Sequence, residues 1–138
     1  MIRGVFDCNV VMSGIGWRNE PYQCLVSVAR RKSRPFVTDW IIEEYRRTAT
    51  RMEGERIFRR SPWPMLDWFL SCAQRVESAP LGKQRSRDAK DDPYLACALA
   101  ARAGLIISRD PDLLALEKPF GTAILTPRQF LNHLAGLE

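Results

Sequence analysis

The segment IRGVFD, residues 2–7, decides the fold class, because it is a mostly apolar run that ends in an acid. Such a run predicts a buried strand over residues 2–6, with Asp7 at its carboxyl end. An aspartate in that position loses its contact with water unless a partner compensates for the loss. Asp7 is therefore the first candidate functional residue.

Strand-like and helix-like segments alternate along the rest of the chain. We predict strands at 35–38, 75–78, 105–108 and 123–125, and helices at 22–31, 40–52, 56–60, 65–73, 93–103, 111–116 and from 127 onward. A turn is expected at 13–16, Asp39 is expected to cap the second helix, and Gly104 is expected to end the alanine-rich helix. This order is typical of an α/β fold, with a parallel sheet of four to five strands covered by helices on both faces. In such folds the functional site lies at the carboxyl ends of the strands.

Composition limits the class of protein. The 138 residues are 46% hydrophobic and 27% charged, which fits one globular domain over residues 1–138 rather than a disordered chain. No apolar run reaches the roughly 18–20 residues of a membrane-spanning helix. Asp7 interrupts the N-terminal segment, where a signal peptide would have an unbroken apolar stretch. We therefore expect a cytoplasmic protein without a membrane partner, whose four scattered cysteines are free thiols.

Charge and histidine content narrow the function. Lys and Arg number 21 against 16 Asp and Glu, so the net charge of +5 favours a polyanionic partner. His133 is the only histidine, which argues against Ser-His-Asp, Cys-His and multi-histidine zinc sites. If the chain is an enzyme, carboxylates must perform its chemistry.

Acidic residues recur beside the predicted strands. They are Asp7, Glu43, Glu44, Asp91, Asp92 and Asp110. Carboxylates gathered at one sheet edge repel one another and need a counter-ion, and Mg²⁺ prefers such oxygen ligands. Each acid at a helix start is, taken alone, also explained as a helix cap. The joint pattern predicts a site for a hard divalent cation.

Four stretches together resemble the PIN-domain nuclease family. They are FDCNVVMS (6–13), TDWIIEEY (38–45), DDPYLACA (91–98) and LIISRDPDLL (105–114), and the tail ILTPRQFL (124–131) resembles the last strand and helix of the family. The resemblance spans nearly the whole chain, in order and with fitting gaps. It implies a PIN-like fold and a metal-dependent endoribonuclease, a hydrolase that cuts RNA phosphodiester bonds with a metal-activated water.

The resemblance also implies a catalytic and metal-binding set. One or two Mg²⁺ or Mn²⁺ ions would be held by Asp7, Glu44, Asp92 and Asp110. Spacing within the family favours Glu44 over Glu43 and Asp92 over Asp91. Both choices remain open.

Three supporting residues follow from the same resemblance. Asn9 would orient Asp7 by hydrogen bonding, Asp91 would assist Asp92, and Ser108 would stand near the metal. Asp112 is a weaker alternative to Asp110.

Basic residues flank these motifs. The polar loop 80–90 carries Lys83, Arg85 and Arg87 directly before the third motif, so these side chains are candidate phosphate contacts. Arg109, where related proteins often carry a small residue, is another candidate.

Two further segments allow two interpretations each. The arginine-rich stretch 46–60 is either a helix face exposed to solvent or a contact surface for an acidic partner. The tryptophan-rich stretch 63–70 either packs in the core or forms a surface for a partner or a homodimer. Many relatives of this size are toxins of bacterial toxin–antitoxin pairs, which implies a small antitoxin protein as partner.

Two other classes compete with a nuclease. A non-catalytic nucleic-acid-binding or regulatory domain of the same fold would be expected to lack at least one of the acids, and none is missing here. A response-regulator receiver domain needs an acid pair after its first strand and a lysine after its fifth, where this chain has Asp7 alone and Thr126-Pro127.

Overall fold

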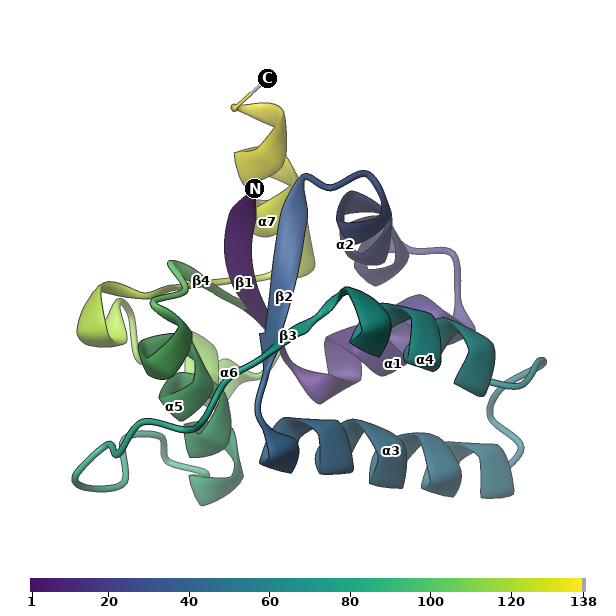
Figure 1. Ribbon diagram of the computed structural model, residues 1–138, viewed down its shortest axis with the longest axis horizontal. Helices are drawn as coiled ribbons and strands as arrows, with labels where there is room; N and C mark the ends of the chain where they lie inside the picture. The colour runs from purple at the N-terminus through teal and green to yellow at the C-terminus, as the bar shows by residue number, and fades with distance from the viewer. Residues whose placement is uncertain (138) are drawn as a thin grey trace.

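Five parallel strands form the centre of the computed structural model, which describes residues 1–137 (Figure 1). The strand order is β3-β2-β1-β4-β5. The central strand β1 (Ile2–Phe6) pairs with β2 (Ser33–Val37) on one side and with β4 (Leu105–Ile107) on the other, while β3 (Gln74–Arg75) and β5 (Ala123–Leu125) form the edges. Because all pairs are parallel, the carboxyl ends of the strands share one edge of the sheet.

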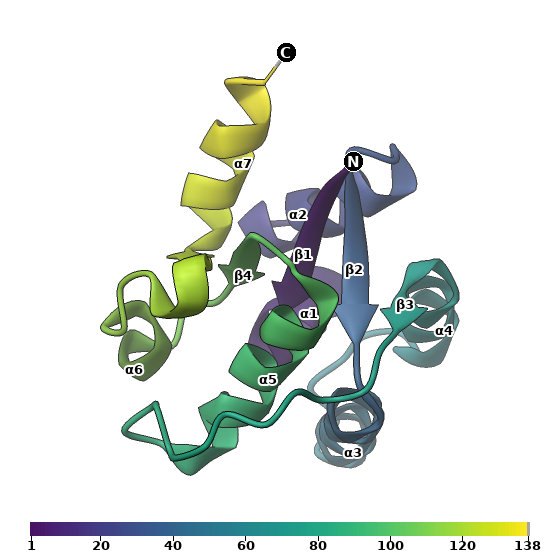
Figure 2. The same cartoon turned by 60° about the vertical axis from the view of Figure 1, so that its left-hand side comes forward.

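Helices cover both faces of this sheet. Within residues 1–137 they are α1 (Cys8–Gly16), α2 (Glu20–Ala29), α3 (Asp39–Gly54), α4 (Trp63–Cys72), α5 (Asp92–Ala101), α6 (Pro111–Leu114) and α7 (Pro127–Ala135), with short 3₁₀ helices at Ala89–Asp91 and Pro119–Gly121. Figure 2 shows α5 in front of the sheet and α1, α2 and α4 behind it. Helix α3 lies beyond the carboxyl ends of β1 and β2 (Figures 1 and 2). The expected α/β fold is confirmed.

Buried aromatic side chains join the layers. Phe6 packs edge to face against Phe69 of α4 and Phe130 of α7, with ring centroids 5.5 and 6.0 Å apart. Tyr45 of α3 is fully buried and donates a hydrogen bond from its hydroxyl to the carbonyl oxygen of Phe6. This contact attaches α3 to the end of β1, one residue before Asp7.

The expected turn at 13–16 is wrong, because α1 continues through these residues to Gly16. A Cβ atom on Gly14 would lie 2.8 Å from Leu25 Cδ1 and 2.9 Å from the Pro21 carbonyl oxygen. Gly14 therefore permits the close approach of α1 and α2 and does not break the helix.

Three other local predictions are corrected. Residues 56–60 form no helix, because Arg56, two residues after the end of α3, adopts a left-handed φ of 58°. Helix α5 ends at Ala101 and is capped by Arg102, whose φ is 50°, so Gly104 is not its cap. Thr38 rather than Asp39 caps α3, since its side chain accepts a hydrogen bond from the Ile41 N–H.

Among the described residues, no helix combines the length and the apolar character that crossing a bilayer requires.

Candidate metal centre

Asp7 is buried at the carboxyl end of β1. Its Oδ2 accepts a hydrogen bond from the Ser108 hydroxyl at 2.7 Å, and the same hydroxyl oxygen accepts one from the Asp110 N–H at 2.9 Å. Burial raises the pKa of Asp7, hydrogen bonds from Ser108 and the Cys8 N–H oppose this rise, and the charges of Asp110 and Glu44 add to it. The ionised form of Asp7 therefore gains from a nearby cation.

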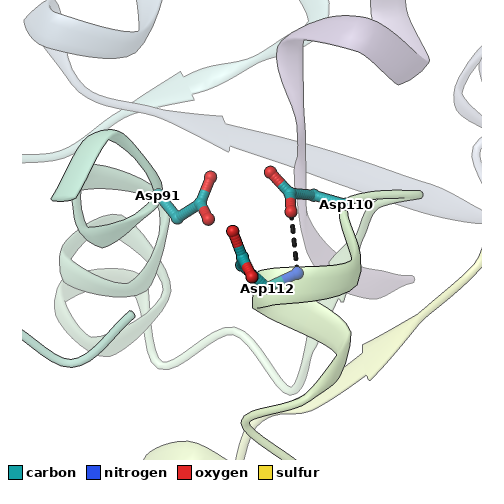
Figure 3. Close-up of side chains that lie close together, drawn as sticks. All are labelled: Asp91, Asp110 and Asp112. Carbon is teal, nitrogen blue, oxygen red and sulfur yellow. Dashed lines mark hydrogen bonds between the residues drawn. The ribbon is translucent and has the colours of Figure 1, made fainter. Parts of the chain in front are cut away.

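Three more carboxylates converge beside this strand end. One oxygen from each of Asp91, Asp110 and Asp112 lies within 4.8 Å of the other two. Asp91 comes from the turn before α5, whereas Asp110 caps α6 through a 2.8 Å hydrogen bond from the Asp112 N–H. Figure 3 shows the side chains pointing toward one another from these separate elements.

Asp91 is buried despite its charge. Burial raises the pKa of this carboxyl group to about 7, against the effect of a 3.0 Å hydrogen bond from the Ser86 hydroxyl, and the nearby Asp110 raises it further. Mutual repulsion of this kind is relieved when a cation binds between the groups.

Glu44 approaches the same edge from α3. Its charge contributes to the raised pKa of Asp7, and it is half-buried and paired with Arg47 at 2.5 Å. Glu43 is exposed. The structure thus brings Glu44, rather than Glu43, into the electrostatic surroundings of Asp7.

The structure brings Asp91, and not the expected Asp92, into the acidic group. The Asp92 carboxylate accepts hydrogen bonds from the backbone N–H groups of Arg85 and Ser86, at 2.9 and 2.7 Å. Adjacent residues on a helix point about 100° apart, so only one of two neighbouring acids faces a given site. Asp92 instead holds the preceding loop in place.

The hydrogen bond to the Asp7 carboxylate that is expected from Asn9 comes from Ser108. Asn9 is exposed and, within residues 1–137, makes no hydrogen bond to Asp7. A local sequence pattern could not predict the contact between Ser108 and Asp7, because 101 positions separate the two residues. Ser86, whose hydroxyl contacts Asp91, lies in a loop with no pattern that predicts such a role.

The basic loop lies next to this centre. Lys83, Arg85 and Arg87 are exposed on the segment that Asp92 holds. The Arg85 guanidinium donates to the Leu81 carbonyl oxygen at 3.0 Å and lies 5.1 Å from the ring centroid of Phe120. Arg109 is exposed directly before Asp110.

The donor set fits a hard divalent cation, because all the converging side chains offer carboxylate oxygens. Cys8 follows Asp7, and burial raises the pKa of its thiol to about 12, so without a metal this thiol stays protonated near neutral pH. His133 lies in the last turn of α7, which ends far from the carboxyl edge of the sheet (Figure 1).

A parallel sheet with acids gathered at its carboxyl edge is the arrangement expected of an α/β protein that binds a cation through carboxylates. The chain belongs to the PIN domain family, whose sequence model matches residues 3–112. PIN domains are generally nucleases, a class of hydrolases, and generally bind divalent metal ions.

The structure is also similar to the crystal structure of PAE2754 from Pyrobaculum aerophilum. The two share 19% sequence identity with a TM-score of 0.66, over 98% of this chain and 90% of the other. This likeness shows a shared fold. A comparison with curated proteins finds no match.

Proposed function

We propose that this chain is an endoribonuclease that hydrolyses RNA phosphodiester bonds with Mg²⁺ or Mn²⁺. One observation carries the proposal: oxygens of Asp91, Asp110 and Asp112 lie within 4.8 Å of one another, beside the buried Asp7, in a PIN domain. Repulsion between these carboxylates raises the free energy of the metal-free protein, and a bound cation turns it into attraction.

The ligands that we propose are Asp7, Glu44 and Asp110, with Asp91 in the place expected of Asp92. When bound, one or two cations would lower the pKa of a coordinated water and neutralise charge on the phosphate. Ser108 fixes the Asp7 carboxylate, and Tyr45 fixes the helix that carries Glu44. In the reaction, the oxygen of water would bond to phosphorus, the bond between phosphorus and the leaving ribose oxygen would break, and a proton released by the water would end on that oxygen.

The distribution of charge supports a nucleic acid as substrate. Assigning four acids to the centre leaves 12 of the 16, against 21 Lys and Arg in the whole chain. The rest of the molecule is thus more basic than the net charge of +5 indicates. Lys83, Arg85, Arg87 and Arg109 are the side chains that we propose as phosphate contacts.

Cleavage of defined RNAs by the purified protein tests this function. We expect cleavage with Mg²⁺ or Mn²⁺, none with a chelator, and a loss of activity in Asp7→Asn and Glu44→Gln. Glu43→Gln is the matched control, because Glu43 is exposed one residue away. Cleavage that survives both the chelator and Asp7→Asn would refute the mechanism, and RNA binding without cleavage would favour a non-catalytic domain.

We further propose that the chain acts in the cytoplasm as the toxin of a type II pair. This role rests on the likeness to bacterial toxins of the family. Expression should arrest growth, an adjacent small reading frame should relieve the arrest, and Asp7→Asn should be harmless. Unaffected growth in cells that contain the folded, active protein would contradict the role.

A groove on the far side of the sheet from α5 is the surface that we assign to the antitoxin. It has a volume of about 1060 Å³, lies between α2, α4 and the segment 57–61, and is lined by apolar side chains that include Trp17, Ile57 and Trp68. Arg18, Arg59 and Arg60 also line it, and no acid does among the described residues. This charge fits an acidic amphipathic segment of a partner.

Variants in this groove test the assignment. Trp68→Ala and Arg59→Glu should weaken antitoxin binding in a pull-down of the two chains, while RNA cleavage remains. If the groove instead binds a second copy of the chain, light scattering should detect a dimer that these substitutions disrupt. That result would overturn the assignment to an antitoxin.

A further inference from the structure

A second, shallow cavity opens at the start of α5, the helix that follows Asp91 of the candidate metal centre. It has a volume of about 500 Å³ and lies between the first turn of α3, residues 78–84 and the start of α5. Its lining combines apolar with polar side chains, among them Trp40, Leu81, Lys83, Gln84, Asp92 and Pro93. A mostly apolar hollow with a few polar groups is typical of a site for a small organic group.

Trp40 is the most distinctive side chain of this cavity. It remains 37% exposed, and its ring packs edge to face against Tyr94 with centroids 6.0 Å apart and planes at 88°. Tyr94 is itself buried, so this contact holds the indole in one orientation. An exposed aromatic ring held in this way is a suitable partner for stacking.

Two contacts connect the cavity to the metal centre. Tyr94, which packs against Trp40, accepts a hydrogen bond at its hydroxyl from the Cys8 N–H at 3.2 Å, directly after Asp7. On the other side, Asp92 lines the cavity and accepts a hydrogen bond from the Ser86 N–H, and the Ser86 hydroxyl donates to Asp91 of the acidic group at 3.0 Å. The cavity is therefore a neighbour of the proposed cleavage site.

The loop beside the cavity carries positively charged side chains on a backbone that Asp92 holds in place. Lys83 lines the cavity, and the backbone of Arg85 and Ser86 is held by the carboxylate of Asp92. Gln84 is held as well, because its side-chain amide donates to the Ser86 carbonyl oxygen at 2.9 Å. A chain of phosphates along this loop would be attracted by its charge.

We propose that this cavity binds an unstacked base of a single-stranded RNA next to the phosphate that is cut, with Trp40 as the stacking platform. That the ligand is RNA rests on the proposed function, whereas the existence of the site rests on the cavity, Trp40 and the basic loop. Bases in a duplex are stacked on their neighbours and cannot enter, so the cavity selects single strands.

Equilibrium binding in the presence of a chelator tests the base site without cleavage. A fluorescent single-stranded RNA is compared with a ribose–phosphate chain of the same length that lacks bases, for the wild type, Trp40→Ala and Trp40→Phe. We expect Trp40→Ala to weaken binding of the RNA about 5- to 100-fold and Trp40→Phe to retain most of it. The baseless chain should bind all three proteins equally.

Trp17→Ala is the matched control, because Trp17 is 47% exposed but lines the other groove. It should leave RNA binding unchanged. Equal weakening of both ligands by Trp40→Ala, or no weakening of either, overturns the base site. Because no metal is present, a protein that passes this test and yet fails to cleave would refute the proposed nuclease and not the base site.

Discussion

Asp91 and Asp92 are neighbours in sequence, yet their carboxylates have different partners. Asp91 is buried beside the half-buried Asp110 and Asp112, whereas Asp92 accepts two backbone hydrogen bonds from the loop 85–86. The sequence could predict that one acid of this pair would reach the carboxyl edge of the sheet. Which of the two acids faces the site could not be predicted, because that choice depends on the 3₁₀ turn at Ala89–Asp91, which sets the rotation of the chain as it enters α5.

Substitution of the two acids separates their roles. Asp91→Asn removes a charge from the centre and should lower kcat/KM for RNA by about 10²–10³-fold. Asp92→Asn weakens the hold on the loop and should raise KM, while kcat stays within about tenfold. Steady-state cleavage and calorimetric titration with Mn²⁺ measure both effects. The reverse order, with Asp92→Asn the inactive variant, would assign the ligand role to Asp92.

The raised pKa of Asp91 predicts how the metal-free protein responds to pH. The folded pKa is about 7 against an ordinary value of 3.8, so between these values the folded state keeps a proton that the unfolded chain has lost. The free energy of unfolding should therefore fall as pH rises through this window. The raised pKa of Asp7 acts in the same direction.

Urea unfolding in the presence of a chelator, at several pH values from 4 to 8, measures this response. Asp91→Asn should show a shallower decline than the wild type because it cannot titrate, and Mn²⁺ should reduce the decline in the wild type because the cation replaces the proton. Identical slopes for the two proteins would contradict the burial of Asp91 as an acid.

At the scale of elements, the sequence predicts β1, β4 and β5 more faithfully than it predicts helix boundaries or the edge strand β3, which covers Gln74–Arg75 rather than 75–78. The apolar runs that became β1, β4 and β5 are short and clearly bounded, so their positions could be predicted. Helix α1 was missed because Ser13 and Gly14 are typical of turns, while the contact that explains Gly14 is made with α2. A tertiary contact of this kind has no signature in a local window.

Alanine at two glycines tests this explanation of α1. Gly14→Ala should lower the free energy of unfolding by about 1–3 kcal/mol, because the new methyl group would overlap Leu25 and the Pro21 carbonyl. Gly54→Ala is the control at the end of α3, where, apart from the local chain and helix backbone, no described atom lies within 4 Å of the new methyl group. It should raise stability by about 0.4–1 kcal/mol. Equal effects in urea unfolding would contradict the close packing of α1 on α2.

At the scale of the whole molecule, a parallel sheet brings together acids that are far apart in sequence. Asp7 and Asp110 follow neighbouring strands, and Asp91 reaches the same edge from the turn before α5. Because parallel strands end at a common edge, this gathering was predictable once the strands were placed. The Trp40 cavity was not predictable, since it depends on how the loop 78–84 folds against α5.

The central claim is that this acidic edge supports hydrolysis by a metal-activated water. Cleavage of RNA in ¹⁸O-labelled water, with Mn²⁺ present and mass spectrometry of the new ends, tests it most directly. The account predicts a phosphate monoester that carries one ¹⁸O atom from the solvent, formed by the wild type and not by Asp7→Asn. A 2′,3′-cyclic phosphate, or unlabelled ends that form equally with a chelator, would contradict it.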